Sequence, residues 1–307
     1  MNPFISDVAI DDQMSYDLLL ALQDLREVMP DWFTSIMLFV SSTPFYLLIP
    51  VAMAVFVFLC VDKRSGEWMM MNISLANYIG HLLKDVVANP RPWVEDDRIV
   101  PEERALGDSA GYSTPSGHTV CIAAGLGTLI TILKKRWATV LFLAMILIVM
   151  FSRLYLGVHT LLDVVSGALF AAIIIAINWC LIRISYRDEN RYIAVAALYA
   201  VIVITATMIW VLVTDDYDSL LKTGGFIIGT MVGRVVEHQY IGYEVRKTTV
   251  GRNVCRLLIG LLTAGVLLIV PYVLLGSVHG SAVGGLLSSF GMFVIAPKII
   301  MTMGLNE

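Results

Sequence analysis

The sequence predicts an all-α membrane protein, a polytopic bundle of about nine transmembrane helices preceded by an interfacial amphipathic helix. The first observation is composition: 58% of the 307 residues are hydrophobic and only 15% are charged, whereas soluble domains average about 25% charged residues. The second is that apolar runs long enough to cross a hydrocarbon core of about 30 Å recur along the chain. The third is that basic and acidic connections alternate between these runs.

The N-terminal stretch is acidic and is expected to hold a helix that lies along the membrane surface. Leu18, Leu22 and Leu25 recur at helical spacing, which places them on one face with charged residues opposite. Residues 32–43 are apolar but too short to cross a membrane. No cleavable signal peptide is expected, because the chain opens with acidic residues instead of a basic start and an apolar core. Residues 1–43 are therefore interpreted as a separate N-terminal segment.

Nine apolar spans are expected after this segment. Their approximate ranges are 44–61, 67–88, 115–133, 137–154, 159–182, 192–213, 219–241, 254–276 and 281–300. Most of the Lys and Arg residues fall on one side of this arrangement: Lys63, Arg64, Lys134, Lys135, Arg136, Arg183, Arg187, Arg191, Arg246, Lys247, Arg252, Arg256 and Lys298. Because Lys and Arg collect in short cytoplasmic loops, this side is expected to be cytoplasmic, with the N-terminus outside and the C-terminus inside.

The opposite side is acidic and is expected to be extracytoplasmic, at a cell membrane. It holds the N-terminus, the loop 93–114 and the acidic residues of 214–218. The spans also end on this side with five basic or imidazole side chains: Lys84, Arg91, His118, Arg153 and His159. Three separate blocks of sequence are therefore predicted to meet at one outward-facing mouth, within a membrane core of residues 44–182. Residues 183–307 are expected to add further transmembrane helices, whose role the sequence does not indicate.

Charge and cysteine usage exclude several classes of partner. The net charge is −4 and no basic block stands out, so a nucleic-acid partner is not expected. The four cysteines lie in or beside apolar runs without paired spacing, which argues against a disulfide framework or a zinc site. No cofactor is expected. The sequence does not indicate an oligomeric state.

The seventh span carries two further patterns that are expected to be structural. Gly225, Gly229 and Gly233 recur at intervals of four, which lets membrane helices approach closely. Arg234, Glu237 and His238 follow within helical reach of one another. Because they lie towards the inner end of the span, pairing inside the protein is favoured over a transport path.

Three cations at the membrane edge indicate an anion. Unpaired charges there are costly and usually mark a functional site or an ion pair. Pro92 keeps Arg91 in an extended segment beside Lys84, and a guanidinium can bind a phosphate through two parallel hydrogen bonds. Lys84 and Arg91 could each instead reach for lipid headgroups. That alternative explains neither Arg153 nor the two histidines.

Residues 114–118 begin the third span and contain a candidate anion site. Ser116 and Gly117 fall where the helix starts, so free N–H groups and the helix dipole favour an anion there. Gly117 also permits close approach of a ligand. Taken alone, a serine at this position is equally well explained as an ordinary helix cap.

His159 and Asp163 are four residues apart at the start of the fifth span, so they share a helix face. Asp163 can hydrogen-bond one imidazole nitrogen while the other nitrogen faces the site, as in catalytic histidines. His118 supplies a second imidazole, and no cysteine or carboxylate cluster is present to hold a metal. Metal-free phosphoryl transfer through a phosphohistidine is the chemistry that this set favours.

Together, these blocks resemble the three signature motifs of the type 2 phosphatidic acid phosphatase superfamily. The matching residues are Lys84, Arg91 and Pro92; Pro115, Ser116, Gly117 and His118; and Ser152, Arg153, His159 and Asp163. The motifs span residues 84–163, and the likeness in hydropathy extends over about 44–182. Nine spans with an outward N-terminus are also similar to the glucose-6-phosphatase branch.

The resemblance implies a role for each motif residue. Lys84, Arg91, Arg153, Ser116 and the Gly117 amide would bind the phosphoryl oxygens. His159 would attack phosphorus, Asp163 would orient it, and His118 would protonate the leaving oxygen. Fixed donors would offset charge in the transition state, and water would release phosphate from His159. The acidic loop 93–114 is expected to shape or gate substrate access instead of binding phosphate.

The expected substrate is a lipid phosphomonoester or pyrophosphate, since a mouth at the membrane rim can receive a headgroup while the chain stays in the bilayer. Phosphatidate, phosphatidylglycerophosphate, a sphingoid phosphate and a polyprenyl diphosphate all satisfy this description. The alternatives are a sugar-phosphate phosphatase of the glucose-6-phosphatase type, vanadate-dependent haloperoxidase chemistry, and a non-catalytic lipid-binding or transport protein. The membrane spans argue against the haloperoxidases, which are soluble, and the complete motifs argue against a non-catalytic protein.

Overall fold

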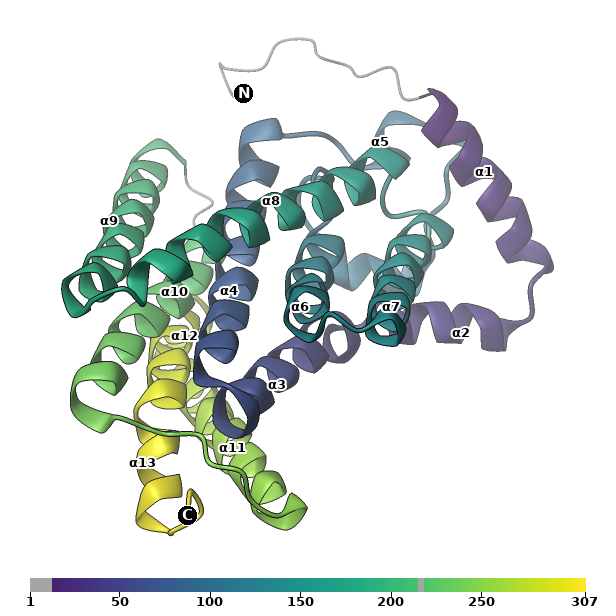
Figure 1. The fold of residues 1–307 in the computed structure, drawn as a ribbon. Helices are drawn as coiled ribbons and strands as arrows, with labels where there is room; N and C mark the ends of the chain where they lie inside the picture. Colours follow the sequence, from purple (N-terminus) through teal and green to yellow (C-terminus); the bar gives the residue numbers. More distant parts are fainter. Residues whose placement is uncertain (1–12, 215–217) are drawn as a thin grey trace. The chain divides into compact units, whose positions relative to one another are not determined.

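The computed structural model describes residues 13–214 and 218–307 (Figure 1). Within these ranges every regular element is helical and no β-strand occurs, which confirms the predicted all-α class. Residues 1–12, which hold the start of the acidic N-terminus, lie outside the described residues. So do residues 215–217 of the predicted outer loop.

Seven helical segments in the described ranges are long and apolar enough to cross a membrane. They are Pro44–Val61, Arg136–Tyr155, Leu161–Ser185, Glu189–Val213, Asp218–Ile241, Val250–Leu275 and Ser277–Thr302. These segments coincide with seven of the nine predicted spans, and the chain is a multi-pass membrane protein. The other two predicted spans correspond to helices α4 (Lys63–Val87) and α6 (Gly117–Leu133). Since α6 has only 17 residues and a full crossing takes about 20, nine crossings stay a prediction.

The chain divides into two compact units. One comprises the chain up to Pro50 together with Ile79–Ile173, and the other comprises Val51–Tyr78 together with Ile174–Glu307. Helices α3, α4 and α8 contribute residues to both units. All the predicted site residues belong to the first unit.

The first unit contains helices that surround the α6–α7 hairpin (Figure 1). Its elements are α1 (Gln13–Val28), α2 (Asp31–Val40), the π-helical turn η1 (Pro44–Leu48), the start of α3 (Ile49–Phe56), the end of α4, α5 (Pro92–Glu95), the 3₁₀ turn η3 (Glu103–Asp108), α6, α7 (Arg136–Tyr155) and the first half of α8 (Leu161–Ser185). Both α1 and α2 pack against α7.

The N-terminal helix α1 forms where the sequence predicts an amphipathic helix. Its apolar face packs against protein, because Leu18 and Leu22 contact a buried cluster that contains Leu19, Leu154 and Val164. The leucines therefore cover the end of α7 and the start of α8. A location of α1 at the membrane surface stays a prediction.

A tight turn joins α7 to α8 and delivers His159 into the first unit. Gly157 in this turn has φ +71°, a conformation that residues with a Cβ rarely adopt. A Cβ at this position would lie 3.3 Å from the Cα of Pro101, so a side chain here would also crowd the neighbouring loop. Val158 and His159 follow directly and are both buried.

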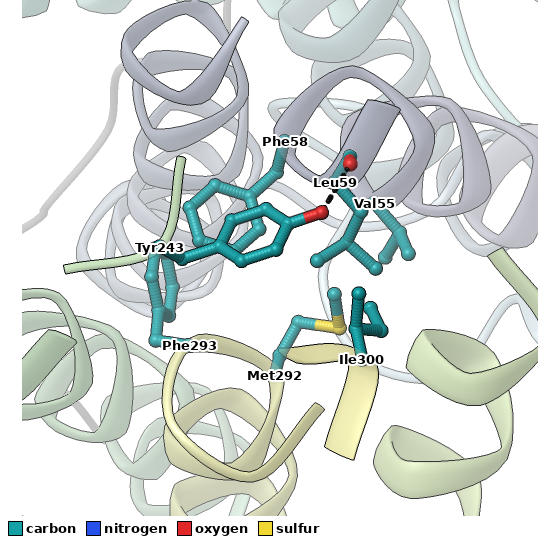
Figure 2. Close-up of a cluster of buried hydrophobic side chains, with 7 residues drawn as sticks. All are labelled: Val55, Phe58, Leu59, Tyr243, Met292, Phe293 and Ile300. Atoms are coloured by element: carbon teal, nitrogen blue, oxygen red, sulfur yellow. Dashed lines mark hydrogen bonds between the residues drawn. The ribbon is translucent and has the colours of Figure 1, made fainter. Parts of the chain in front are cut away.

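The second unit holds the C-terminal helices. Its elements are η2 (Val57–Val61), α9 (Glu189–Val213), α10 (Asp218–Val236), η4 (Glu237–Ile241), α11 (Val250–Leu275), α12 (Ser277–Phe293) and α13 (Ile295–Thr302), with the remaining parts of α3, α4 and α8. Figure 2 shows one core of this unit: Val55, Phe58, Leu59, Tyr243, Met292, Phe293 and Ile300. The Tyr243 hydroxyl donates a hydrogen bond of 2.7 Å to the Leu59 carbonyl, which satisfies the phenol inside an apolar cluster.

The glycines of α10 let it pack closely against α12, as the sequence predicts. A Cβ on Gly225 would lie 2.3 Å from the Ala282 carbonyl oxygen, and one on Gly229 would lie 2.1 Å from the Leu286 carbonyl oxygen. Any larger residue would force the two backbones apart. This pattern is therefore a helix-packing surface.

The charged residues at the end of α10 pair inside the second unit, with α4 instead of with one another. Arg234 lies 3.1 Å from Glu67, and both side chains are fully buried. Tyr192 donates to both carboxylate oxygens of Glu67 at 3.0 Å. Glu237 forms an ion pair with Lys63. Because each of these charges has an ion-pair partner inside the unit, the structure supports a packing role over a transport path.

Candidate active site

His159 and Asp163 form a buried pair at the N-terminal end of α8. The His159 Nδ1 atom lies 3.3 Å from Asp163 Oδ2, and both side chains are 1% exposed or less. The backbone N–H of Thr160 also donates to Asp163 Oδ2, at 2.7 Å. Since the carboxylate accepts hydrogen bonds, this arrangement favours the tautomer with its proton on Nδ1 and leaves a lone pair on Nε2.

Arg91 lies on the other side of the imidazole. Its Nη1 atom is 3.0 Å from His159 Nε2, and the guanidinium also donates to the carbonyls of Gly111, Val158 and Ala110 at 2.8–3.1 Å. As the sequence predicts, Arg91 has an extended backbone directly before Pro92. Most of its donors are therefore occupied by the protein, and its main contact within the site is with Nε2.

The electrostatic environment keeps Arg91 charged and His159 neutral. Burial lowers the pKa of Arg91 to about 10, which leaves the guanidinium protonated at neutral pH. Burial also lowers the pKa of His159 well below its usual value, although the hydrogen bond to Asp163 opposes this effect. The charge of Arg91 lowers the pKa of His159 further. A neutral imidazole with its lone pair on Nε2 is the nucleophilic form.

Arg153 approaches the site from the last turn of α7 and is 1% exposed. Its Nη1 donates to the Ser41 hydroxyl, and its Nη2 donates to the Ser109 hydroxyl at 2.7 Å. Its Nε has no hydrogen-bond partner within the described part of the chain. Buried donors are normally paired, so this guanidinium has hydrogen-bonding capacity that the protein does not use.

The start of α6 supplies two more unsatisfied groups. Ser116 occupies the cap position, but its hydroxyl caps no N–H group of the helix. Among the described residues neither the Ser116 hydroxyl nor His118 Nε2 has a hydrogen-bond partner, and both side chains are buried. Ordinary helix capping therefore does not explain Ser116. The Ser116 N–H is taken by the Asp163 carbonyl at 3.0 Å, so it is not free for a ligand.

Lys84 lies beside the same helix end. A Cβ placed on Gly117 would be 3.9 Å from the Lys84 Cε, and the Lys84 ammonium donates to the Tyr112 carbonyl at 3.0 Å. The first unit thus brings the end of α4, the start of α6, the end of α7 and the start of α8 to one place. All the residues of the three motif blocks that were predicted to form a site are contributed by these ends and by the adjoining loops.

Residues 109–114 form a segment that holds several of these side chains at once. Ser109 binds Arg153, the carbonyls of Ala110 and Gly111 bind Arg91, and the Tyr112 carbonyl binds Lys84. Ser113 donates to Asp163 Oδ2 at 2.5 Å and lies 3.3 Å from His159 Nδ1, and the Thr114 hydroxyl donates to Asp163 Oδ1. From the sequence, the loop 93–114 was expected to shape or gate substrate access, and these contacts with Lys84, Arg91, Arg153 and Asp163 were not predicted. The only feature of the sequence that could have indicated these contacts is the pair of hydroxyl side chains, Ser113 and Thr114, directly ahead of Pro115.

The residues present do not form an evident metal centre. In the described ranges, no group of three or more His, Cys, Asp or Glu side chains is arranged to hold a metal ion. The site instead combines three cations, two imidazoles and one carboxylate whose oxygens accept hydrogen bonds from its neighbours. Such a set can bind an anion and transfer a group to a histidine.

Comparison with known proteins identifies two family matches. Residues 68–187 match the PAP2 superfamily, and residues 221–307 match the PAP2 superfamily phosphatase, transmembrane extension. The first match contains all three motif blocks. The second covers the C-terminal helices, whose role the sequence does not indicate. No solved structure shows significant similarity to the chain.

Several curated proteins are similar to parts of the chain. Lipid phosphate phosphatase delta from Arabidopsis thaliana is 28% identical over 171 residues, which cover 52% of this chain and 40% of that protein. Human sphingosine-1-phosphate phosphatase 2 is 35% identical over 125 residues, 39% of this chain and 30% of the relative. Undecaprenyl-diphosphatase from Sulfolobus acidocaldarius is 30% identical over 127 residues, 41% of this chain and 59% of the relative.

In each case the aligned part spans less than two thirds of the relative's length. The two family matches lie in different parts of the chain, name the same superfamily and together cover more than half of the sequence. They agree with the resemblance that the three motif blocks carry, and the chain belongs to the PAP2 superfamily.

Proposed function

We propose that this protein is a metal-independent membrane phosphatase that hydrolyses a lipid phosphomonoester or pyrophosphate through a phosphohistidine at His159. One observation carries the proposal. Ser116 Oγ, His118 Nε2 and Arg153 Nε are buried polar atoms without hydrogen-bond partners in the described chain, and all three belong to the predicted phosphate site. A phosphoryl group has the acceptor oxygens that such donors lack.

The first chemical step is transfer of the phosphoryl group to His159. The lone pair on Nε2 attacks phosphorus, and the bond from phosphorus to the leaving oxygen breaks. His118, in its imidazolium form, gives a proton to that oxygen and becomes neutral, and Asp163 stabilises the positive charge that develops on the His159 ring. Lys84, Arg91 and Arg153 offset the negative charge on the remaining phosphoryl oxygens, with help from Ser116 and the Gly117 amide.

The second step releases phosphate. Water attacks phosphorus, the bond between phosphorus and nitrogen breaks, and His118 accepts the proton of the attacking water. His159 and His118 then return to their starting protonation states. In the structure Arg91 Nη1 lies 3.0 Å from His159 Nε2, so in this mechanism that contact breaks and the guanidinium turns to the phosphoryl oxygens before the Nε2 lone pair attacks.

The relatives support a lipid substrate. Their names refer to lipid phosphates, sphingosine-1-phosphate and undecaprenyl diphosphate, and each of these has a phosphate on a long apolar body. The same names argue against a hexose phosphate. The acidic loop 93–114 would shape access to the site, since two of its acids, Asp96 and Glu102, pair with Arg98 and Arg104 of the same loop.

The proposed topology has nine crossings, with α4 and α6 completing the seven long apolar segments. The N-terminus would be outside, the C-terminus inside, and the site on the extracytoplasmic side of a cell membrane. The charge distribution of the loops supports this orientation. Residues 183–307 would form the additional helices beyond the catalytic core.

The test is a substrate panel with the full chain in detergent micelles containing EDTA. Phosphate release is measured from phosphatidate, a sphingoid phosphate, a polyprenyl diphosphate and a hexose phosphate. We expect at least one lipid to be hydrolysed and the hexose phosphate to be left intact, and the His159→Gln variant to be inactive but folded. Preference for hexose phosphate would favour the sugar phosphatase. No hydrolysis of any substrate would favour a lipid-binding or transport protein, and a requirement for Mg²⁺ would contradict the mechanism.

A further inference from the structure

Residues 31–48 lie outside both family matches and yet contact the site. The matches begin at residue 68, whereas α2 and η1 lie between Asp31 and Leu48. Two side chains from this segment, Ser41 and Tyr46, contact residues of the predicted phosphate site. The three motif blocks therefore do not contain every residue that shapes the site.

Ser41 fixes the guanidinium of Arg153. It is the residue that ends α2, it is 3% exposed, and its hydroxyl accepts a hydrogen bond from Arg153 Nη1. Ser109 holds Nη2 in the same way. With both terminal nitrogens held, the plane of the guanidinium is set while Nε is left without a partner in the described chain.

Helix α2 is itself firmly placed, so Ser41 is a rigid partner. Thr34 and Tyr155 share a buried hydrogen bond of 2.9 Å between their hydroxyls. Met37 packs in a buried cluster with Tyr155, Leu156 and Val158. These contacts join α2 to the end of α7, the helix that carries Arg153.

Tyr46 covers the imidazole of His118. The two ring centroids are 3.9 Å apart and the ring planes are inclined by 42°. This contact fixes the plane of the imidazole without using its Nε2 atom, which has no partner in the described residues. The ring of Tyr46 thus leaves Nε2 available while limiting the orientations that His118 can adopt.

We propose that Ser41 and Tyr46 are positioning residues of the phosphatase, an inference that rests on the proposed function. Ser41 orients Arg153 towards the phosphoryl oxygens. Tyr46 orients His118 so that its proton reaches the leaving oxygen as the bond between phosphorus and that oxygen breaks. Neither residue exchanges a proton or a bond with the substrate in this scheme.

The two roles predict different kinetic signatures. Arg153 binds the phosphoryl group, which all substrates share, so losing Ser41 affects every substrate. His118 protonates the leaving oxygen, and this matters for an alkoxide but little for a nitrophenolate, which leaves readily without a proton. A variant of Tyr46 should therefore discriminate between alkyl and nitrophenyl phosphates. Substitution of a residue that serves only packing would lower the activity with both substrates equally.

The experiment compares variants of the full chain in detergent micelles, with a long-chain alkyl phosphate and with 4-nitrophenyl phosphate. For Tyr46→Ala we expect kcat to fall about tenfold or more with the alkyl phosphate and less than about twofold with the nitrophenyl phosphate. Tyr46→Phe keeps the ring and should match the wild type with both substrates. Phe45→Ala is the matched control, since the Phe45 ring packs against Phe39, whereas Tyr46 makes the ring contact with His118.

For Ser41→Ala we expect kcat/KM to fall about tenfold with both substrates, because one hydrogen bond to a charged group is lost. Ser41→Thr keeps the hydroxyl and should restore most of the activity. Ser42→Ala is the matched control, because among the described residues the Ser42 hydroxyl donates within its own turn, to the Phe39 carbonyl at 2.6 Å. Retained thermal unfolding midpoints establish that each variant is folded, and Tyr46→Leu replaces Tyr46→Ala if the smaller residue prevents folding.

Equal losses with both substrates in the Tyr46 variants, or no loss at all, would overturn the role of Tyr46. Unchanged kcat/KM in Ser41→Ala, or no recovery in Ser41→Thr, would overturn the role of Ser41. If the wild-type protein hydrolyses neither substrate nor any lipid phosphate, the proposed function itself is wrong. That outcome is distinct from a wild-type enzyme that is active but insensitive to these two positions.

Discussion

Replacing Asp163 with asparagine tests how the carboxylate supports His159. In the structure Asp163 accepts hydrogen bonds from Ser113 at 2.5 Å, from the Thr160 N–H at 2.7 Å and from Thr114, and it lies 3.3 Å from His159 Nδ1. Asparagine has nearly the same shape, and its amide oxygen can keep the bond to Thr160. The substitution therefore removes the negative charge while preserving the local fold.

The expected magnitude follows from the hydrogen bond to His159. A hydrogen bond to a charged group contributes about 1.5–3 kcal/mol, against about 0.5–1.5 kcal/mol for a neutral one. The difference grows as His159 becomes positively charged on accepting the phosphoryl group. A loss of about 1.4–2.7 kcal/mol of transition-state stabilisation corresponds to a decrease in kcat of about 10- to 100-fold. KM should change little, because the carboxylate binds neighbouring protein groups and not the phosphate.

The assay measures phosphate release from a short-chain lipid phosphate in detergent micelles, with kcat and KM determined separately. Asp97→Asn is the matched control, since it also removes a negative charge from the first unit but at an exposed position. An unchanged kcat in Asp163→Asn would refute the role given to the carboxylate. So would a rise in KM at constant kcat, which would place Asp163 in substrate binding.

Three further predictions concern the groups around this pair and the second unit. Ser113→Ala should lower kcat about tenfold, because it removes a hydrogen bond to the buried carboxylate; Ser113→Thr should restore it, and a fully active alanine variant would contradict this. Burial lowers the pKa of His159, so only the unfolded chain binds a proton there as the pH drops below about 6.5. The free energy of unfolding should therefore fall by up to about 1.4 kcal/mol for each pH unit below about 6.5. If His159→Gln unfolds in acid in the same way as the wild type, His159 is not the cause of this loss. Glu67→Gln and Arg234→Met should each cost about 3–5 kcal/mol of unfolding free energy, whereas the double variant should cost less than their sum; additive losses in chemical unfolding would show that the pair is not coupled.

The helical class and the motif residues could be predicted because each has a signature in the sequence. In lipid a spanning segment satisfies its backbone hydrogen bonds by forming a helix, and the long run of apolar side chains that such a helix needs identifies the span directly. The glycine pattern of α10 is visible for a similar reason, since only residues without a side chain allow two helix backbones to come so close. The three cations and two histidines were conspicuous because they fall at the spacings of three motif blocks.

The supporting contacts could not be predicted, for identifiable physical reasons. Arg91 and Lys84 are held largely by backbone carbonyls, and every residue type has a carbonyl. Ser41 lies 112 positions before Arg153, and a single serine in an apolar segment has no pattern that would reveal its partner. Capping was an equally good explanation of Ser116 in the sequence, and only the unpartnered hydroxyl in the structure argues against it.

The pairing of Arg234 also depended on the fold. The sequence places Glu237 and His238 within helical reach of Arg234, so these neighbours in the chain were the expected partners of its guanidinium. In the structure its partner is Glu67, which is 167 positions away. The pair joins α4 to α10 in the second unit, and hydropathy alone does not specify which helices such a pair will join.

The central claim is that phosphate passes through a covalent bond to His159. The most direct measurement is rapid quenching of the enzyme with a lipid substrate that carries radiolabelled phosphate, followed by denaturing electrophoresis and peptide mapping. A phosphohistidine intermediate predicts label bound to the protein at His159, stable to alkali but released by acid, and absent from His159→Gln. Label that persists in His159→Gln, or an active enzyme that never acquires label during turnover, would contradict the account.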